Sequence, residues 1–193
     1  MLRKFWNNKP LGLIPAMLML LQMVWQKIRN KLHSCIYTKN IGKCGICVKI
    51  YPNTIFKYPK TITIGNNVSI GFNCDIHNDE IPKGILELGD NVSIDKECLI
   101  DYSGDLIIGK NTHIAWGTYI ITHTHGYDPH SEPIPKPLTI GENVFIGAKC
   151  IITPSVNHIG HNVMIGTGSV VTKDVPDYAV VVGNPAKVIK YKK

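Results

Sequence analysis

A six-residue repeat runs through the middle of this chain, from about Ile62 to Pro176. An aliphatic residue opens each block, Gly often follows, and the fifth place is small, as in IGNNVS, IGFNCD, LGDNVS, IGKNTH and IGENVF. This period does not fit an α-helix, which repeats every ~3.6 residues, but it does fit a short strand that ends in a bend. Three blocks predict a triangular coil, and successive coils should stack about 4.8 Å apart, as parallel strands do. We therefore expect an all-β solenoid.

The repeat assigns a role to each place in the block. The opening aliphatic residue and the fifth residue are predicted to point inward, which makes Cys74, Cys98 and Cys150 buried thiols. Gly at the second place is expected to allow corner backbone angles that a Cβ would forbid. Cys44 and Cys47 form a lone C-x-x-C pair. A zinc site needs about four ligands and no second pair is visible, so this spacing is interpreted as incidental.

The repeat is interrupted between successive coils. The first residues of the coils are Ile64, Leu88, Ile108, Ile140 and Ile159, and each interval between them is longer than the eighteen residues of three blocks. The last interval is one residue too long, which predicts a bulge near residues 157–158. The largest excess, fourteen residues before Ile140, predicts a proline-rich loop. Long ordered loops on regular scaffolds usually carry function, so this loop is the expected site.

The amino-terminal segment differs from the repeat region in charge. Residues 1–74 carry eleven Lys and Arg and no acidic residue, whereas residues 75–193 have a net charge of −4. Leu11 to Trp25 is apolar but shorter than the roughly twenty residues of a spanning helix, and no signal-peptide cleavage site follows it. Pro15 fits the first turn of a helix running to about Leu32. This helix is expected either to pack on protein or to lie in a membrane interface, with Lys and Arg on headgroups.

The repeats, the loop THTHGYDP and the ending VVTKDVPDYAVVVGNPAKVIK together resemble the hexapeptide-repeat acyltransferases over residues 62–190. Within that family the chain is most similar to the sugar O-acetyltransferases of the maltose, galactoside, nodulation and capsule polysaccharide type, and to the streptogramin acetyltransferases. The resemblance implies a left-handed parallel β-helix, a homotrimer and acetyl-CoA as acyl donor, with no metal required. We expect a helical segment over residues 1–45, the β-helix over 46–178 with a loop at about 123–138, and a carboxy-terminal cap over 179–193, as a helix or an extended tail.

The resemblance also implies roles for individual residues. The stretch from Ile108 to Pro129 is colinear with the family pattern, which makes His125 the general base, with His123 second. A neutral imidazole can take the proton of a sugar hydroxyl as it attacks a thioester. The family pattern further assigns donor binding to Ala148, Thr167, Thr172, Lys173 and Lys187, and acceptor binding to Asp95, Tyr127 and Asp128.

The leading prediction is therefore an acetyl-CoA-dependent O-acetyltransferase acting on a sugar or polysaccharide precursor, in the cytoplasm or at the inner face of the membrane. N-acetylation of an amino sugar and streptogramin acetylation stay open, because the same base serves both. A zinc carbonic anhydrase needs three converging imidazoles; His113 stands where a ligand would be sought, but the required spacing is absent. A non-catalytic β-helix is the remaining alternative. Charge alone suggests nucleic acid, and no aromatic-basic motif supports that partner.

Overall fold

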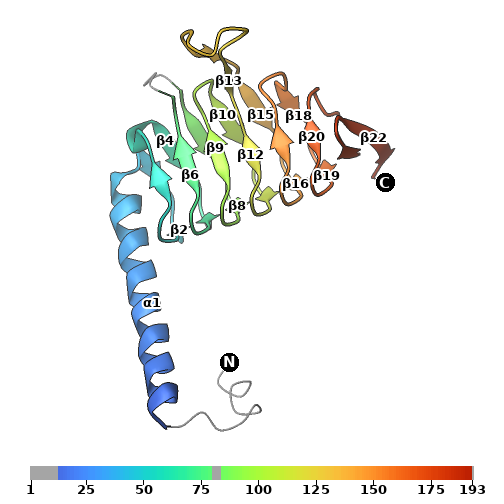
Figure 1. The fold of residues 1–193 in the computed structure, drawn as a ribbon. Helices are drawn as coiled ribbons and strands as arrows, with labels where there is room; N and C mark the ends of the chain where they lie inside the picture. Colours follow the sequence, from blue (N-terminus) through green and yellow to red (C-terminus); the bar gives the residue numbers. More distant parts are fainter. Residues whose placement is uncertain (1–12, 80–83, 193) are drawn as a thin grey trace.

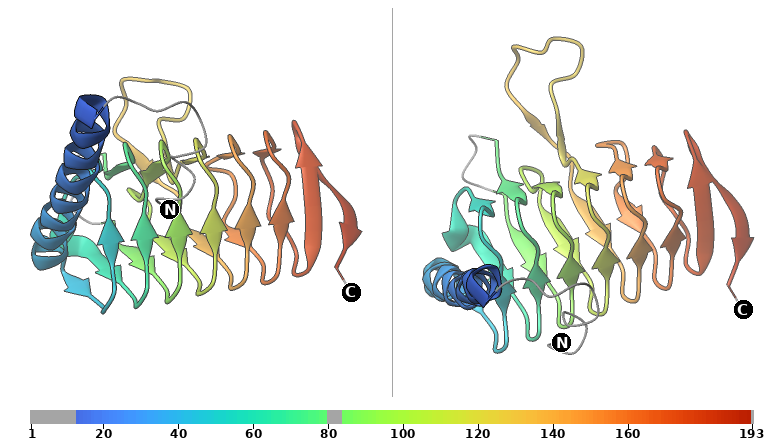
Figure 2. Two further views of the ribbon diagram at one scale, coloured as in Figure 1. Left: turned by 90° about the horizontal axis from the view of Figure 1, so that it is seen from below. Right: turned by 60° about the horizontal axis from the view of Figure 1, so that its bottom comes forward.

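The computed structural model describes residues 13–79 and 84–192. One helix, α1 (Leu13–Asn40), precedes a left-handed parallel β-helix of about seven turns (Figure 1). The predicted all-β solenoid and its hexad repeat are confirmed. Each turn contributes one short strand to each of three sheets, here named A, B and C in chain order, and the turns stack side by side along a single axis (Figure 2).

The strands of each sheet come from successive turns. Sheet A holds β1 (Lys43–Cys44), β4 (Ile62–Ile64), β7 (Leu86–Leu88), β10 (Leu106–Ile108), β15 (Leu138–Ile140) and β18 (His158–Ile159). Sheet B holds β2 (Lys49–Ile50), β5 (Ser69–Ile70), β8 (Ser93–Ile94), β11 (His113–Ile114), β16 (Phe145–Ile146), β19 (Met164–Ile165), β21 (Ala179–Gly183) and β22 (Ala186–Tyr191). Sheet C holds β3 (Ile55–Phe56), β6 (Asp75–His77), β9 (Leu99–Asp101), β12 (Tyr119–Ile120), β17 (Ile151–Ile152) and β20 (Val170–Val171).

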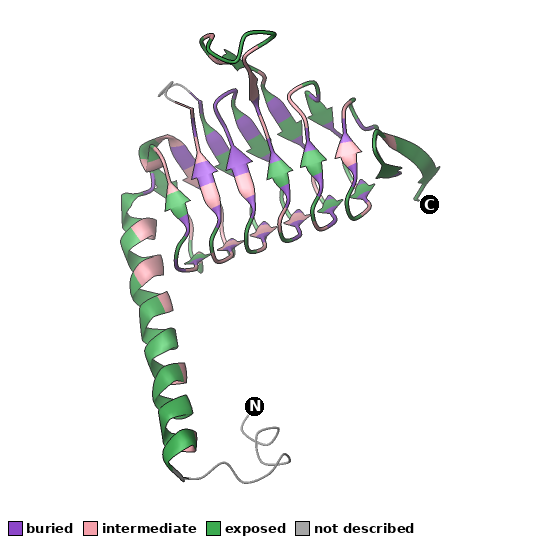
Figure 3. Ribbon diagram, viewed as in Figure 1, coloured by how far each residue is buried: buried purple, intermediate pink, exposed green. Residues whose placement is uncertain are grey.

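The register confirms the predicted phase of the coils. The sheet A positions pair in sequence from Ile64 through Leu88, Ile108 and Ile140 to Ile159. These aliphatic side chains are almost completely buried. Figure 3 colours the buried residues along the solenoid purple. Cys74, Cys98 and Cys150 are buried beside them, as expected, and all six cysteines are free. Burying apolar area between neighbouring turns is what stabilises such a solenoid.

The glycines at the second place of the block have a different role from the one expected. Their φ angles are not positive; instead, a Cβ there would collide with the next turn. On Gly109 it would lie 2.6 Å from the backbone of Gly141, and on Gly141 it would lie 2.8 Å from that of Gly160. Close approach of stacked backbones, rather than corner angle, therefore selects Gly at this place.

Positive φ falls instead on the fourth place of the blocks that turn the A/B and B/C corners, and on the A/B corner this residue is most often Asn. Asn67, Asn91, Asn111 and Asn143 have φ between 56° and 59°. Asn tolerates the left-handed region better than other side chains. Their amides also form a ladder along one corner, with N···O distances of 3.3, 2.9 and 3.0 Å from turn to turn. The corner between sheets A and B is thus fixed by backbone conformation and by side-chain hydrogen bonds together.

Irregularity is confined to one of the three corners. In the first six turns the inward residues are six apart across the A/B and B/C corners, as in Ile108, Ile114 and Ile120. Every longer spacing falls where sheet C passes to sheet A. There lie the 3-10 turn η2 (Pro59–Thr61), the long loop before β15, and the extra exposed residue at 157–158, where the bulge was predicted. The C/A corner is therefore the one that leaves room for a site.

The two ends of the solenoid are closed differently. Residues 33–41 cover the first turn, with Ser34 Oγ donating to Val48 O (3.2 Å) and Tyr37 against Phe56 (ring centroids 5.0 Å apart). The helix runs to Asn40, beyond the expected Leu32, because its last turns make this contact. At the other end the tail is extended, since β22 folds back antiparallel on β21.

The first half of α1 projects beyond the solenoid and is largely exposed (Figure 3). Its exposed apolar side chains include Met17, Leu18, Leu21, Val24 and Trp25. Within residues 13–79 and 84–192, no helix combines the length and the hydropathy that crossing a bilayer requires.

Candidate active site

The two histidines of the THTH motif lie at the root of the long loop, on the C/A corner. After β12 the chain leaves sheet C, and β13 (His123–Thr124) pairs antiparallel with β14 (Ile134–Pro135). The resulting hairpin carries the loop away from the solenoid (Figure 2). The imidazole rings of His123 and His125 lie together, with centroids 5.2 Å apart and planes at 88°.

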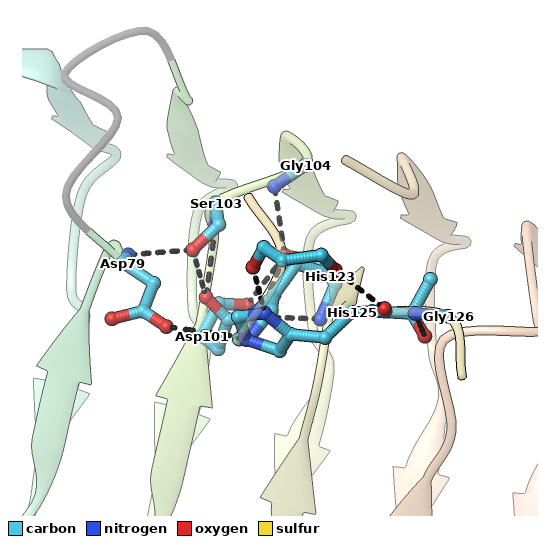
Figure 4. A network of polar contacts seen from close by, with 10 residues as sticks. Asp79, Asp101, Ser103, Gly104, His123, His125 and Gly126 are labelled. Carbon is cyan, nitrogen blue, oxygen red and sulfur yellow. Dashed lines mark hydrogen bonds and ion pairs between the residues drawn. The ribbon is translucent and has the colours of Figure 1, made fainter. Parts of the chain in front are cut away.

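His123 is held by a buried carboxylate from the preceding turn. Its Nδ1 lies 2.9 Å from Oδ2 of Asp101, which is 1% exposed (Figure 4). The backbone N–H of Thr122 donates to the same carboxylate (2.6 Å), and Ser103 donates both its N–H (3.0 Å) and its hydroxyl. Burial would raise the pKa of Asp101, but these hydrogen bonds together hold it below its usual value. Asp101 is therefore an anion, so Nδ1 of His123 carries the hydrogen, and in the neutral ring Nε2 is the acceptor.

The ring of His125 has the same donor and acceptor nitrogens, but a different partner fixes them. Its Nδ1 lies 2.7 Å from the carbonyl oxygen of Ser131, which can only accept. Ser131 Oγ donates back to the His125 carbonyl (2.6 Å), so the loop holds this residue from both sides. Nδ1 is again the donor, and Nε2 carries the free lone pair that a general base requires.

Both Nε2 atoms face Asp79, which comes from the turn before Asp101. Oδ2 of Asp79 lies 3.4 Å from Nε2 of His123 and 4.0 Å from Nε2 of His125. Its backbone N–H donates to Ser103 Oγ (2.7 Å), which ties it to the same network. The side chains of His125 and Asp79 are 32% and 41% exposed, so the cluster opens to solvent.

Asp79, Asp101 and Ser103 were not among the residues predicted from the sequence. The signal that could have found them is the coil register, since His77 pairs with Asp101, and Ile100 with Ile120. Following the same corner from turn to turn leads from Asp79 to Asp101 and on to the histidines. The loop motif alone does not contain this signal, because Asp79 and Asp101 belong to earlier turns.

The other two predicted loop residues have different surroundings. Tyr127 is fully exposed at the tip. Asp128 accepts a hydrogen bond from the backbone N–H of His130 (2.9 Å), and its carbonyl accepts from Ser131 N–H (3.0 Å). Asp128 therefore shapes the turn that brings Ser131 to His125.

The remaining predicted residues fall into two groups. Thr172 and Lys173 follow β20 on the C/A corner, the corner of the histidines. Asp95, Ala148 and Thr167 lie on the B/C corner, where Asp95 approaches His113 Nε2 at 3.2 Å and a shallow hollow is lined by Phe72, Lys96 and Trp116. Lys187 is exposed on β22.

The two corners are separated by the width of sheet C. Five residues of extended chain span about 16 Å. Within one chain, the B/C group therefore does not converge on the histidines. His113, the residue considered for zinc, packs edge-on against Phe145 (5.5 Å between centroids) and is not part of the histidine cluster.

A hexad solenoid with a histidine-bearing loop at one corner defines the class of protein, and comparison with known proteins agrees. Residues 137–173 match the family described as the hexapeptide repeat of succinyl-transferase. The chain is 30% identical over 143 residues to WbbJ of Escherichia coli strain K12, whose provisional name is lipopolysaccharide biosynthesis O-acetyl transferase, covering 67% of this chain and 71% of that protein. The chain therefore belongs to the hexapeptide-repeat acyltransferase family, as its motifs predict.

Two further relatives extend the comparison. The galactoside O-acetyltransferase of Escherichia coli strain K12 is 33% identical over 141 residues, which cover 73% of this chain and 59% of that protein. Among solved structures, a variant of the Bacillus cereus N-acyltransferase AntD in complex with dTDP and coenzyme A superposes with a TM-score of 0.69 at 25% identity, covering 79% of this chain and 85% of the other.

Proposed function

We propose that this protein transfers an acetyl group from acetyl-CoA to a hydroxyl of a sugar or polysaccharide precursor, with His125 as general base. The observation that carries the proposal is the hydrogen bond from His125 Nδ1 to Ser131 O (2.7 Å), which leaves Nε2 free at an open corner. Coenzyme A bound to a structural relative supports the donor, and the names of two sequence relatives as O-acetyltransferases support the acceptor.

The proposed reaction is a direct transfer. Nε2 of His125 takes the proton of the acceptor hydroxyl while that oxygen attacks the thioester carbonyl. A backbone N–H of the facing coil stabilises the oxyanion of the tetrahedral intermediate. The intermediate then expels the coenzyme A thiolate, which recovers the proton from the imidazolium. His123, held by Asp101 at 2.9 Å, is the second base on the same corner.

We further propose that the complete site forms between subunits of a homotrimer. The histidines, Thr172 and Lys173 lie on the C/A corner, whereas Ala148, Thr167 and Asp95 lie on the B/C corner, about 16 Å away across sheet C. Two chains that align these corners would bring the donor-binding and base-bearing residues together. In that arrangement Lys187 contacts the coenzyme A phosphates, and Asp95, Tyr127 and Asp128 face the acceptor.

The acceptor class and the need for His125 can be tested together. Consumption of acetyl-CoA would be followed against a panel of sugars, nucleotide sugars, amino sugars and streptogramins, with the wild type and His125→Ala side by side. Turnover on a hydroxyl acceptor that is lost in the variant supports the proposal. Turnover on amines only would favour N-acylation, the second candidate, which the likeness to an amine-acylating enzyme supports. No turnover on any acceptor, or full turnover in His125→Ala, would count against it.

The projecting half of α1 supports a peripheral site of action. Its exposed apolar residues are followed along the helix by Lys27, Arg29 and Lys31, the composition of an interfacial helix on an anionic bilayer at the cytoplasmic side. We expect the full-length protein to float with anionic vesicles, and Leu18→Asp/Trp25→Asp to float less. Equal flotation of both, or none by the wild type, would remove the membrane contact from the proposal.

A further inference from the structure

We propose that Asp79, His123 and His125 form a binding site for a divalent transition-metal ion, Zn²⁺ in particular, and that the bound ion inhibits acyl transfer. The inhibitory role rests on the proposed function, whereas the metal site does not. One ligand atom from each residue lies within 4.8 Å of the other two. Two imidazoles and one carboxylate with an open position are a known ligand set for such ions.

The orientation of the two imidazoles is what distinguishes this cluster from a chance grouping. Histidines that bind metals usually donate their other ring N–H to a carboxylate or a carbonyl, which fixes the ring and the tautomer. Both forms occur here: His123 Nδ1 lies 2.9 Å from Asp101 Oδ2, and His125 Nδ1 lies 2.7 Å from Ser131 O. Both rings are therefore locked with Nε2 directed at Asp79.

In the neutral tautomers described above, the three converging atoms are all acceptors. Two Nε2 lone pairs face a carboxylate oxygen at 3.4 and 4.0 Å, an arrangement that a proton on one ring or a metal cation among the three atoms would stabilise. A tetrahedral zinc ion with bonds of ~2.0–2.1 Å separates its ligands by about 3.3 Å. The distance from His123 Nε2 to Asp79 Oδ2 (3.4 Å) already matches this value, whereas His125 Nε2, now 4.0 Å from Asp79 Oδ2, must move closer.

A bound ion would block acyl transfer because it coordinates the atom that is proposed to act as the general base. His125 Nε2 is the lone pair proposed to take the acceptor's proton, and an ion bound there removes it. The partial exposure of Asp79 and His125 gives an ion a route from solvent. A bound ion therefore competes with catalysis, and the site makes activity sensitive to free Zn²⁺.

The metal site is tested by binding, independently of activity. EDTA-treated full-length protein is titrated with ZnCl₂ by calorimetry, and with CoCl₂ by visible absorption, which reports tetrahedral coordination. We expect one ion per chain and an affinity reduced about 10-fold or more in Asp79→Asn and in Asp101→Asn, which loses the support of His123. Asp75→Asn is the matched control, since Asp75 also lies beside a histidine (His77, 3.6 Å) on the same turn, and its affinity should equal that of the wild type.

Circular dichroism and unfolding curves establish that each variant is folded. Absence of Zn²⁺ binding by the wild type, or equal binding by Asp79→Asn and the wild type, would overturn the site. For the regulatory part, acetyl transfer is measured against free Zn²⁺, each protein relative to its own metal-free rate. Inhibition at the Zn²⁺ concentrations that fill the site supports the regulatory role, provided that Asp79→Asn needs a higher concentration for the same inhibition. Unchanged or faster turnover with the ion bound would overturn this role. Zinc binding without acetyl transfer to any acceptor would leave the site standing and reject the proposed function instead.

Discussion

The B/C and C/A corners of the same solenoid face each other across sheet C, yet they are built by opposite rules. At the B/C corner every turn uses six residues, and the chain stays close to the prism. At the C/A corner each of the first five turns takes extra residues, and the hairpin of β13 and β14 leaves the prism altogether. Regular corners keep the turns in register, whereas the irregular corner gathers polar side chains from several turns. The regular turns that stabilise the solenoid and the polar residues of the candidate site therefore lie along different edges of one repeat.

The strongest test of this division is His125→Ala. Loss of a general base typically lowers turnover by about 10²–10⁴-fold, and we expect an effect of that size on acetyl transfer, with coenzyme A binding and the unfolding midpoint unchanged. His130→Ala, an exposed histidine on the same loop, is the control and should retain activity. Comparable losses in both variants would mean that the loop, not the base, had been damaged.

Asp101→Asn probes a residue of the C/A corner that supports both the fold and the candidate site. Its carboxylate accepts four backbone or hydroxyl hydrogen bonds besides that of His123, and bonds to a charged group contribute about 1.5–3 kcal/mol. We expect destabilisation of that order at pH 7, measured by urea unfolding.

The pH dependence of this effect has a defined sign. Because the pKa of Asp101 is lowered from 3.8 in the folded protein, its contribution is fully present above about pH 4 and is lost as the pH falls through the lowered value. The difference in free energy of unfolding between wild type and Asp101→Asn should therefore shrink below pH 4. A difference that stayed constant from pH 7 to pH 3 would show that the ionised carboxylate is not what stabilises this corner.

Asn111 provides the corresponding test on a regular corner, A/B. Asn111→Ala removes two ladder hydrogen bonds and puts a less tolerant residue at φ 58°, which together should cost about 2 kcal/mol in unfolding free energy without lowering activity. Asn111→Gly restores the backbone freedom and should recover part of the loss. If Gly is no better than Ala, the hydrogen bonds rather than the left-handed backbone hold this corner.

The smallest expected effect is on donor binding at the B/C corner. Thr167→Trp fills the exposed corner that the family pattern assigns to coenzyme A, and we expect KM for acetyl-CoA to rise about tenfold with kcat little changed. Lys110→Trp, at an exposed position on the A/B corner, is the control. A fall in kcat with unchanged KM for Thr167→Trp would remove this residue from donor binding.

The solenoid could be predicted from the sequence because each six-residue block repeats the same pattern of inward-facing aliphatic and small residues. The register of Ile64, Leu88 and Ile108, the buried thiols and the bulge at 157–158 all follow from that period. The role of the second-place Gly was misjudged, because a collision between stacked backbones is absent from a single block. The roles of His125, His123 and the donor-binding residues stay predictions from resemblance.

The six-residue period is visible in the amino-acid sequence, and it predicts the fold, the family and the loop that departs from the repeat. Which residues contact one another depends on how the turns stack in three dimensions. Asp79 and Asp101 lie 22 residues apart, and Asp101 precedes His123 by the same interval, yet stacking places the three within hydrogen-bonding or ion-pairing reach. Asp95 and Thr167, which the family pattern groups with the histidines, lie across sheet C on another corner. The physical reason is the stacking of the turns. Residues one full turn apart in the sequence lie next to each other on the same corner, whereas residues part of a turn apart lie on different corners, separated by the width of a sheet.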